Sequence, residues 1–373
     1  MVLGIRGMPN IQGGVETHAE QLYPRLVKLG CSVNALVRTP STARGASYFQ
    51  GVGLRRIWAP RTSGLEALVH SLLGVAYASL SRPDILHIHA VGPAIVAPLA
   101  RLAGLKVVVT HHGADYERDK WNAFSRWVLR LGESWGMRFS NARIAISRVI
   151  ASSVNAKYGA SSVLVPNGVV VRRPAEGADF PRTLALEPGR YFLQVSRMVP
   201  EKRQADLIAA FRRSGVPGWK LVLAGQLDGS SYSDAIARSA EPDIVLPGFV
   251  TGRSLEQLYS CAGAFVLPSS HEGLPIALLE ALSYGLPVLA SDIPANLEVG
   301  LDAGSYFPVG NVDALASALR KLSLAPQEEA GRHARVRLVR EKYDWDRVAE
   351  QTMEVYRSVL AGGDGTGETN RGM

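Results

Sequence analysis

The amino-acid sequence predicts an α/β protein with two doubly wound domains, each built on a parallel sheet. Strand-like apolar runs alternate with amphipathic helical patterns in two series, which a segment rich in glycine, proline and charge separates at residues 168–188. The chain has 373 residues, of which 47% are hydrophobic and 20% charged, so each half can bury its own core. We therefore expect domains at residues 1–170 and 171–343.

The first series opens with a strand at residues 2–5, which is short for a buried parallel strand and suggests a start upstream of Met1. A glycine-rich turn follows at residues 7–14. Further strands are expected at 32–37, 85–89, 106–110, 142–147 and 162–165, and helices at 15–29, 64–80, 93–102, 121–138 and 148–157.

The second series has the same alternation. A last amphipathic helix is expected at residues 344–360, and the polar tail at 361–373 is expected to be disordered. Strands are expected at 191–195, 220–224, 244–246, 264–267 and 288–290, and helices at 204–213, 231–239, 254–260, 276–284 and 312–322.

Cysteines and apolar runs limit the class of protein. Cys31 and Cys261 are the two cysteines, which is typical of reduced thiols in a cytosol and excludes a disulfide framework. Arg6 and nearby glycines interrupt any signal peptide. The longest uncharged apolar stretches, 67–80 and 85–100, are shorter than the roughly 20 residues of a membrane span. We expect a cytoplasmic protein without a spanning helix.

The net charge of +8 is unevenly distributed along the chain. Residues 1–173 hold 21 Lys and Arg against 8 Asp and Glu, a balance of +13, whereas the remaining residues hold 20 against 25. A basic half indicates that one domain meets an anionic partner. By charge alone, nucleic acid, an anionic membrane surface and a pyrophosphate-linked acceptor all fit.

Two glutamates lie eight positions apart within residues 268–287. Glu272 precedes a predicted helix for which Pro275 suits the first turn, and Glu280 lies about 7 Å further along the axis, at about 1.5 Å per residue. Gly273 and Leu274 would present backbone N–H groups at the positive end of this helix, which suits an anion. The two carboxylates can hold hydroxyls at two ends of a sugar nucleotide; two solvated glutamates are the alternative.

Arg197 and Lys202 follow the strand expected at residues 191–195. Two cations at this spacing can bind a diphosphate leaving group, because preorganised cations stabilise the charge that develops on its oxygens. A solvated surface pair is the alternative interpretation.

These motifs together resemble those of glycosyltransferase family 4, whose members have the GT-B fold. The resemblance rests on Ser-Arg-x-x-x-Glu-Lys at 196–202 and Ser-x-Glu-Gly-x-Pro-x-x-x-x-Glu-Ala at 270–281. Residues 13–16 (Gly-Gly-Val-Glu) are similar to the family's glycine loop, residues 166–169 to its interdomain turn, and the last helix to the segment that returns to the N-terminal domain. The resemblance covers nearly the whole chain and implies two Rossmann-like domains facing a cleft.

The resemblance also implies a nucleoside diphosphate sugar as donor, held mainly by the C-terminal domain. Arg197 and Lys202 are expected to bind its diphosphate, Glu280 the ribose hydroxyls and Glu272 the transferred sugar. Other expected donor contacts involve mainly the backbone: Gly13 and Gly14 near the phosphate, Gly273, Leu274 and Pro275 near the sugar, and Gly248, Phe249 and Val250 along the base.

Two histidines follow the strand expected at residues 106–110. His112 matches the position at which the family places a histidine beside the reacting sugar, where a neutral ring can donate to a hydroxyl or orient the acceptor. His111 is the competing choice. His87 and His89 alternate on a buried strand and are expected to be structural.

A basic and aromatic segment comes next, and Arg118, Lys120 and Trp121 are its candidate acceptor-binding residues. The following helix carries Trp121, Phe124, Trp127, Leu131, Trp135 and Phe139 at helical spacing. These side chains either pack inward as part of a core or form a surface for a membrane or a lipid-linked acceptor.

Several signals are absent from the sequence. The triplet Asp344-Trp-Asp346 begins the last predicted helix and suits helix capping rather than a metal site. Neither a Gly-x-Gly-x-x-Gly motif after the first strand nor a P-loop occurs, which argues against nicotinamide chemistry. We therefore expect no metal and no cofactor.

The predicted function is metal-independent, retaining transfer of a hexose to a hydroxyl, with retention inferred from the family. The expected acceptor is a lipid-linked saccharide of bacterial surface polysaccharide synthesis. The expected further partner is an anionic membrane surface, at the cytoplasmic face of the cell membrane, and not nucleic acid. A sugar-nucleotide epimerase of the same fold is the alternative. Guanosine and uridine diphosphate sugars are both possible donors.

Overall fold

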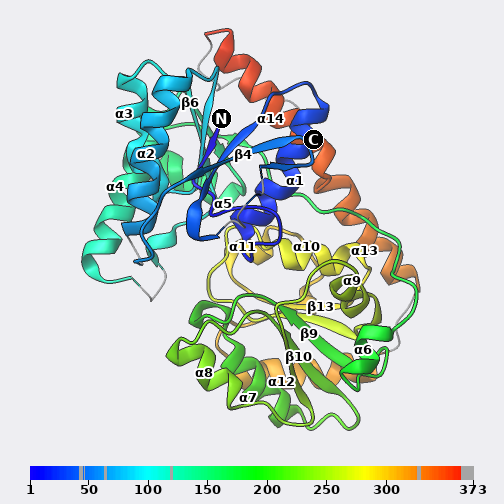
Figure 1. The fold of residues 1–373 in the computed structure, drawn as a ribbon. Helices are drawn as coiled ribbons and strands as arrows, with labels where there is room; N and C mark the ends of the chain where they lie inside the picture. Colours follow the sequence, from blue (N-terminus) through cyan, green and yellow to red (C-terminus); the bar gives the residue numbers. More distant parts are fainter. Residues whose placement is uncertain (42–44, 46, 63–64, 118–120, 326–328, 363–373) are drawn as a thin grey trace. The chain divides into compact units, whose positions relative to one another are not determined.

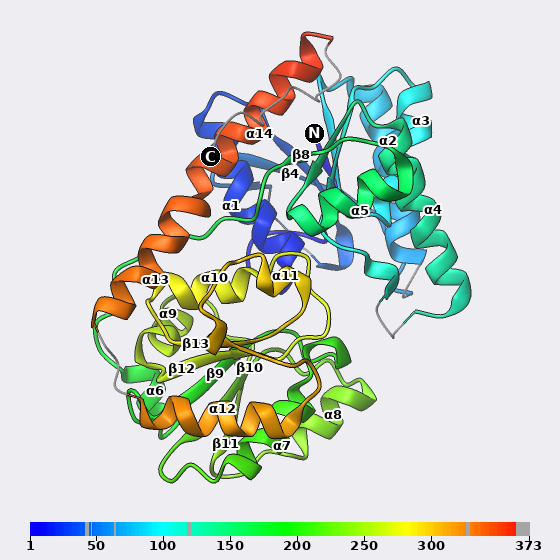
Figure 2. The same cartoon turned by 180° about the vertical axis from the view of Figure 1, so that it is seen from behind.

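The computed structural model describes residues 1–41, 45, 47–62, 65–117, 121–325 and 329–362. They form two compact units, shown in Figure 1 and from behind in Figure 2: Met1–Asn167 with helix α14 (Trp345–Leu360), and Gly168–Asp344. The sequence predicts one domain boundary between residues 170 and 171 and a second between residues 343 and 344. Of the tail for which disorder is predicted, residues 363–373 lie outside the described residues, as do Arg118 and Lys120.

The described residues of the first unit form an eight-stranded sheet in the order β3-β4-β2-β1-β5-β6-β7-β8. Every pairing is parallel except that of β3 with β4. The central strands are buried on both faces, as apolar runs in parallel sheets usually are. The strands are β1 (Val2–Leu3), β2 (Asn34–Arg38), β3 (Tyr48–Phe49), β4 (Val52–Ile57), β5 (Leu86–His89), β6 (Val107–His111), β7 (Ala142–Ala145) and β8 (Val163–Leu164).

The winding of this sheet reverses between β1 and β5. From β1 the chain proceeds outward through β2 to β4, and β5 then returns to the other side of β1 and leads outward to β8. Ligands of doubly wound sheets bind beyond the carboxyl ends of the strands at such a reversal. Gly4 lets these two strand ends approach, since a Cβ there would lie 2.3 Å from the carbonyl oxygen of His89.

Helices cover both faces of the first sheet (Figures 1 and 2). On one side α3 (Ala97–Leu102) contacts both α2 (Leu65–Ser81) and α4 (Ala123–Phe139), and on the other α1 (Gly14–Lys28) packs on α14. Arg25 Nε of α1 donates a 2.7 Å hydrogen bond to Asp346 Oδ1 of α14. Asn122 caps α4, and Ser147 caps α5 (Arg148–Tyr158). Short 3-10 turns lie at η1 (Thr39–Ser41), η2 (Pro93–Val96) and η3 (Asp115–Glu117).

The second unit has a six-stranded parallel sheet among its described residues, in the order β11-β10-β9-β12-β13-β14. Its winding reverses between β9 and β12. The ring of Phe192 stacks on that of Trp219, with centroids 4.5 Å apart, in the core. The strands are β9 (Tyr191–Val195), β10 (Lys220–Ala224), β11 (Ile244–Gly248), β12 (Ala264–Leu267), β13 (Val288–Ser291) and β14 (Tyr306–Phe307).

Helices lie on both faces of the second sheet as well, with α7 against α12 and α10 against α13 (Figure 1). The helices are α6 (Asp179–Thr183), α7 (Gln204–Ser214), α8 (Ser231–Ala237), α9 (Gly252–Cys261), α10 (Ile276–Ser283), α11 (Pro294–Leu297), α12 (Val312–Leu324) and α13 (Glu329–Lys342), with 3-10 turns η4 (Pro200–Lys202) and η5 (Ala303–Ser305).

The predicted fold class, two parallel-sheet α/β domains, is confirmed, but the sequence prediction missed β3, β4, β14, α6, α11 and α13. Two arginines interrupt the apolar pattern of β4. Helix α13 has no apolar stripe, since Val339 is its one buried residue. The linker predicted at 168–188 is wrong in part, because it contains α6.

Candidate active site

The second sheet brings two sequence motifs to one edge. Residues 196–202 follow β9 and residues 268–275 follow β12, and these two strands are parallel neighbours at the reversal of winding. There Lys202 Nζ donates to Glu272 Oε1 at 2.5 Å, with the two side chains 16% and 9% exposed. A predicted cation and a predicted carboxylate thus form an ion pair that the sequence analysis did not anticipate.

Hydrogen bonds within and between the segments 196–202 and 268–275, and from strand β9, support this ion pair. Ser270 N donates to Glu201 O at 2.9 Å, and Gln194 Nε2 of β9 donates to Lys202 O at 3.0 Å. Arg197 lies at the same strand end, with its Nη2 3.8 Å from Glu201 Oε1. The structure therefore places Arg197, Lys202 and Glu272 around one edge of the sheet.

Glu280 lies within α10, and Tyr259 Oη donates to its Oε2 at 2.9 Å. The Tyr259 ring is itself stacked on Tyr284, with centroids 5.3 Å apart. Burial raises the pKa of Glu280 to about 7, although the hydrogen bond from Tyr259 opposes the rise. This carboxyl group therefore titrates near neutral pH in the free protein.

The loop before α10 has the predicted position. Pro275 is the N-cap residue, and its carbonyl accepts hydrogen bonds from the N–H groups of Leu278 and Leu279. Leu274 and Pro275 are buried, and Gly273 is partly exposed. Their contacts with a donor stay a prediction.

The segment predicted to line the base lies at the carboxyl end of β11. Gly248 ends this strand with φ +77°, and a Cβ on it would meet no described atom within 4 Å. Phe249 is exposed and Val250 is buried. Phe249 is 42% exposed, and its contact with a base stays a prediction.

In the first unit, a partly buried ion pair links Arg6 to Glu16 of the glycine loop. Arg6 Nε and Nη2 donate to the Glu16 carboxylate at 2.8 and 3.0 Å, and Arg6 Nη2 also donates to Gln12 O. Burial alone would raise the pKa of Glu16, but the hydrogen bond and charge of Arg6 lower it below its usual value. A Cβ on Gly13 would lie 2.1 Å from Glu16 Oε2, whereas one on Gly14 would meet no described atom within 4 Å.

Sequence reasoning gave Arg6 no role at the site and missed this pair. The available signal was Glu16, an acidic residue in the first turn of the predicted helix, two positions after Gly14.

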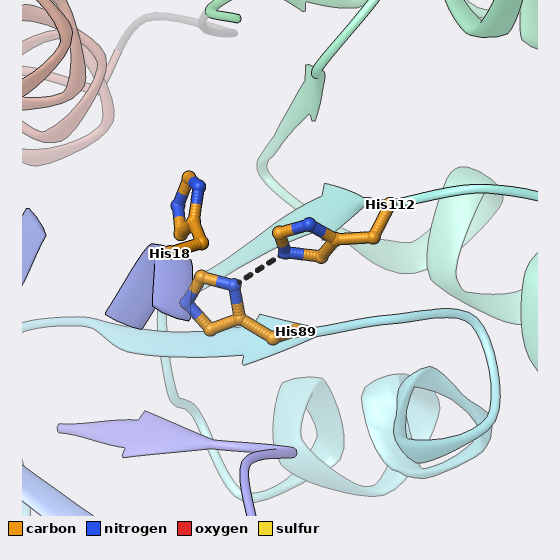
Figure 3. A group of neighbouring side chains, drawn as sticks. All are labelled: His18, His89 and His112. Carbon is orange, nitrogen blue, oxygen red and sulfur yellow. Dashed lines mark hydrogen bonds between the residues drawn. The ribbon is translucent and has the colours of Figure 1, made fainter. Parts of the chain in front are cut away.

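Three histidines gather at the carboxyl edge of the first sheet (Figure 3). His89 ends β5, His112 follows β6, and His18 lies on α1. His89 Nδ1 and His112 Nε2 share a hydrogen bond of 2.9 Å, and the His18 and His112 ring centroids are 4.9 Å apart. Burial lowers the pKa of His18 to about 4 and the pKa values of His89 and His112 well below 6.5, so the three rings are neutral. Sequence reasoning missed His18, one helical turn after Gly14.

His111 has a different environment from His112. Gly113 N donates to its Nδ1 at 3.1 Å, so its Nε2 carries the proton and donates to Glu133 Oε1 at 2.8 Å. Tyr116 and Tyr158 also donate to the buried Glu133 carboxylate. With both ring nitrogens engaged inside the unit, His111 is the weaker candidate for a substrate contact, and His112 is favoured.

Helix α4 carries exposed aromatic side chains. Phe124 and Trp127 are 71% and 58% exposed and stack with ring centroids 6.1 Å apart, while Trp121 before the helix is partly buried. The core-helix interpretation is therefore wrong for Phe124 and Trp127. Within the described residues, no helix has the length and apolarity that a membrane span requires.

Two family models match this chain. The one described as "Glycosyl transferase 4-like domain" matches residues 13–168, and the one described as "Glycosyl transferases group 1" matches residues 177–339. The chain belongs to the GT4-like glycosyltransferases of the GT-B fold. The matched segments fall on the first and the second unit, and the predicted family is confirmed.

This glycosyltransferase has curated relatives along most of its length. Glycogen synthase of Mycobacterium tuberculosis is 29% identical, over 95% of this chain and 93% of the relative. The GDP-mannose:cellobiosyl-diphosphopolyprenol alpha-mannosyltransferase of Xanthomonas campestris is also 29% identical, over 83% of this chain and 82% of the relative.

Solved structures show the same fold. Sucrose-phosphate synthase from Thermosynechococcus elongatus has a TM-score of 0.80 at 20% identity, with 97% of this chain and 99% of that chain covered. The Anabaena protein HepE, in complex with UDP-glucose, has a TM-score of 0.78 at 18% identity, with 96% and 99% covered.

Proposed function

We propose that this glycosyltransferase transfers a hexose from a nucleoside diphosphate sugar to a hydroxyl of a lipid-linked saccharide, with retention at the anomeric carbon. The observation that carries the proposal is the meeting of Arg197, Lys202 and Glu272 where the winding of the second sheet reverses. Doubly wound folds bind nucleotides at such an edge, and the two cations suit a diphosphate.

Departure of the diphosphate is the step that these residues assist. Breaking the bond from the anomeric carbon to the phosphate oxygen leaves negative charge on the diphosphate, which Arg197 and Lys202 neutralise. In the free protein Lys202 is paired with Glu272, so donor binding exchanges one anionic partner of the ammonium for another. Glu272 then accepts hydrogen bonds from hydroxyls of the sugar.

Retention follows from attack on the face that the diphosphate leaves. The acceptor oxygen forms the new bond to the anomeric carbon, the bond to the phosphate oxygen breaks, and that phosphate oxygen takes the acceptor's proton. This route requires neither a covalent enzyme intermediate nor a side chain as base. No metal or cofactor takes part in the proposed reaction.

The rest of the donor is held by contacts of three kinds. Glu280, once ionised, accepts hydrogen bonds from the ribose hydroxyls. The exposed ring of Phe249, between Gly248 and Val250, lies along the base. A Cβ on Gly14 would point into space empty of described atoms. Because Gly14 has no side chain, its backbone can approach a phosphate oxygen of the donor.

The first unit serves the acceptor in this proposal. His112, neutral because desolvation lowers its pKa, donates to or accepts from a sugar hydroxyl. Trp121, with Arg118 and Lys120 next to it in the sequence, contacts the acceptor. The exposed Phe124 and Trp127, with the +13 balance of residues 1–173, suit an anionic membrane surface at the cytoplasmic face. The name of the Xanthomonas relative, which specifies a diphosphopolyprenol acceptor, supports a lipid-linked acceptor.

Thermal unfolding with a panel of uridine and guanosine diphosphate sugars tests the donor site, because a ligand that binds the folded state raises Tm by mass action. We expect one sugar nucleotide to raise Tm, and Lys202→Ala and Glu280→Ala to abolish or greatly reduce the shift. Lys321→Ala, at an exposed position near the end of α12, is the matched control and should keep it. Wild-type shifts in both site variants would remove the basis of the proposal.

Product analysis tests the reaction itself. With the donor identified above and a lipid-linked saccharide, mass spectrometry should detect an acceptor that is one hexose heavier. Sugar epimers formed from the donor alone, without transfer, would instead establish the epimerase alternative.

A further inference from the structure

The histidine cluster of the first unit has the composition of a metal site. One ring nitrogen from each of His18, His89 and His112 lies within 4.8 Å of the other two. The three rings come from different elements, α1, β5 and the loop after β6, and form one group in Figure 3. His18 and His89 are buried, and His112 is partly exposed.

His18 supplies a lone pair that no other described group uses. Its Nδ1 lies 2.9 Å from Asn167 Oδ1, and an amide oxygen can only accept, so Nδ1 carries the ring proton. Its Nε2 is therefore an acceptor, and it is buried without a hydrogen-bond partner in the part of the chain that the structure describes. A buried acceptor without a partner lowers stability, which a ligand at this position would offset.

His89 and His112 hold a single proton between His89 Nδ1 and His112 Nε2. If His89 Nδ1 carries this proton, the ring can change tautomer so that Nε2 carries it instead. His89 Nε2 then donates to Tyr23 Oη, which can accept a hydrogen bond. If His112 carries it, the proton moves to Nδ1 of the same ring. In both cases the two facing nitrogens present lone pairs and each ring stays neutral.

We propose that His18, His89 and His112 bind a divalent transition metal ion of the zinc type. Imidazole nitrogens suit Zn²⁺, Co²⁺ and Ni²⁺, and tetrahedral Zn–N bonds of about 2.0–2.1 Å place ligand nitrogens about 3.4 Å apart. The His89 Nδ1–His112 Nε2 distance is 2.9 Å and all three nitrogens lie within 4.8 Å of one another, so rotation of the rings is needed to bring the nitrogens to this spacing. Asn167 and Tyr23 orient two of the rings from behind, as outer partners of metal-bound histidines commonly do.

Three protein ligands leave a fourth tetrahedral position for water. The bound ion is held by His112, the ring that we assign to a hydroxyl of the reacting sugar, so it inhibits transfer. This consequence rests on the proposed function, whereas binding of the ion does not. The ion plays no part in diphosphate departure, which the second unit assists.

Cobalt substitution tests binding without any activity measurement. Untagged protein, stripped with a chelator and desalted, is titrated with Co²⁺, whose tetrahedral complexes absorb visible light much more strongly than octahedral ones. We expect about one equivalent to bind with a tetrahedral spectrum, which Zn²⁺ bleaches by displacement, and elemental analysis after desalting should find about one Zn²⁺ per chain.

Variants assign the ligands. His18→Ala and His112→Ala should each lose the tetrahedral spectrum and weaken metal binding by at least about tenfold. His333→Ala, on the exposed surface of α13, is the matched control and should bind as wild type. Circular dichroism checks folding, and the partly exposed His112 provides a ligand variant whose folding does not depend on a buried ring.

Absence of a tetrahedral cobalt spectrum in the wild type, or unchanged binding in both ligand variants, overturns the metal site. Chelator-reversible inhibition of transfer by Zn²⁺ should accompany binding and be weaker in His18→Ala. The donor-induced Tm shift, measured in chelator, is independent of the ion, so failure of the metal site and failure of the proposed function are distinguished.

Discussion

Lys202 Nζ contacts Glu272 Oε1 at 2.5 Å, although the two residues are 70 positions apart in the chain. They meet because β9 and β12 are parallel neighbours whose carboxyl ends coincide. In the free protein each charge neutralises the other in a mostly buried place. The pair thus holds both groups in position, and in the proposed reaction a donor diphosphate replaces Glu272 as the partner of Lys202.

Replacing Lys202 by alanine should strongly impair transfer. The leaving diphosphate loses a positive charge, and losing one preorganised group of this kind typically costs about 10²–10³ in kcat. Steady-state kinetics with a radiolabelled donor measure the effect, with Lys321→Ala as the control at an exposed position. A kcat within a factor of two of wild type would contradict the assigned role.

Donor binding should depend on pH through Glu280, whose pKa burial raises to about 7. If the ionised carboxylate binds the ribose hydroxyls, the donor Kd should increase about tenfold for each pH unit below this pKa. Calorimetry between about pH 5.5 and 8.5 measures the profile. Glu280→Gln cannot ionise and should bind weakly with a flat profile; a wild-type profile equally flat would contradict the prediction.

The same pKa has the opposite effect on the stability of the free protein. The folded state holds the Glu280 proton more tightly than the unfolded state, where the pKa is near 4.5, so this residue's contribution to the free energy of unfolding decreases as pH rises from about 4.5 to about 7. Chemical denaturation should therefore show Glu280→Gln gaining stability relative to wild type over this range. A constant difference would show that the carboxyl titrates normally.

Alanine at Gly13 and at Gly14 should have contrasting effects. A methyl group at Gly13 collides with the Glu16 carboxylate and displaces the ion pair with Arg6, which we expect to lower the free energy of unfolding by about 1–3 kcal/mol. At Gly14 it points into space empty of described atoms, so stability should stay within about 1 kcal/mol of wild type. Urea denaturation compares the two.

Donor affinity separates the roles of these glycines further. Because Gly14→Ala would place a methyl group where the phosphate is proposed to approach, it should weaken donor binding while the fold stays intact. Unchanged affinity in this variant would mean that the glycine loop does not approach the donor.

Membrane binding should depend on the aromatic pair of α4. Phe124→Ser with Trp127→Ser removes two stacked, exposed rings, so flotation with anionic liposomes at low salt should decrease while Tm is nearly unchanged. Leu324→Ser is the matched control, since Leu324 is an exposed apolar residue, at 80%, that lies in the second unit. Equal flotation of both variants and wild type would exclude this surface as a membrane contact.

The sequence by itself determined the two-domain α/β class, the family and the candidate donor residues. Strand and helix periodicity is local, so it is visible without coordinates, and the motifs at 196–202 and 270–281 are short runs of specific chemistry. Elements without a regular apolar pattern, such as β4 with its arginines and α13 with one buried residue, could not be predicted on this basis.

Only the tertiary structure decided which distant groups meet. Sequence order leaves open which strands are neighbours, and strand order brings Lys202 to Glu272 and His89 to His112. The tertiary structure also showed that His111 donates a hydrogen bond to Glu133, which favours His112 as the candidate for a substrate contact. It further showed that Arg6 and Glu16 form an ion pair at the glycine loop. These relationships depend on packing between elements remote in the chain, and local periodicity carries no information about that packing.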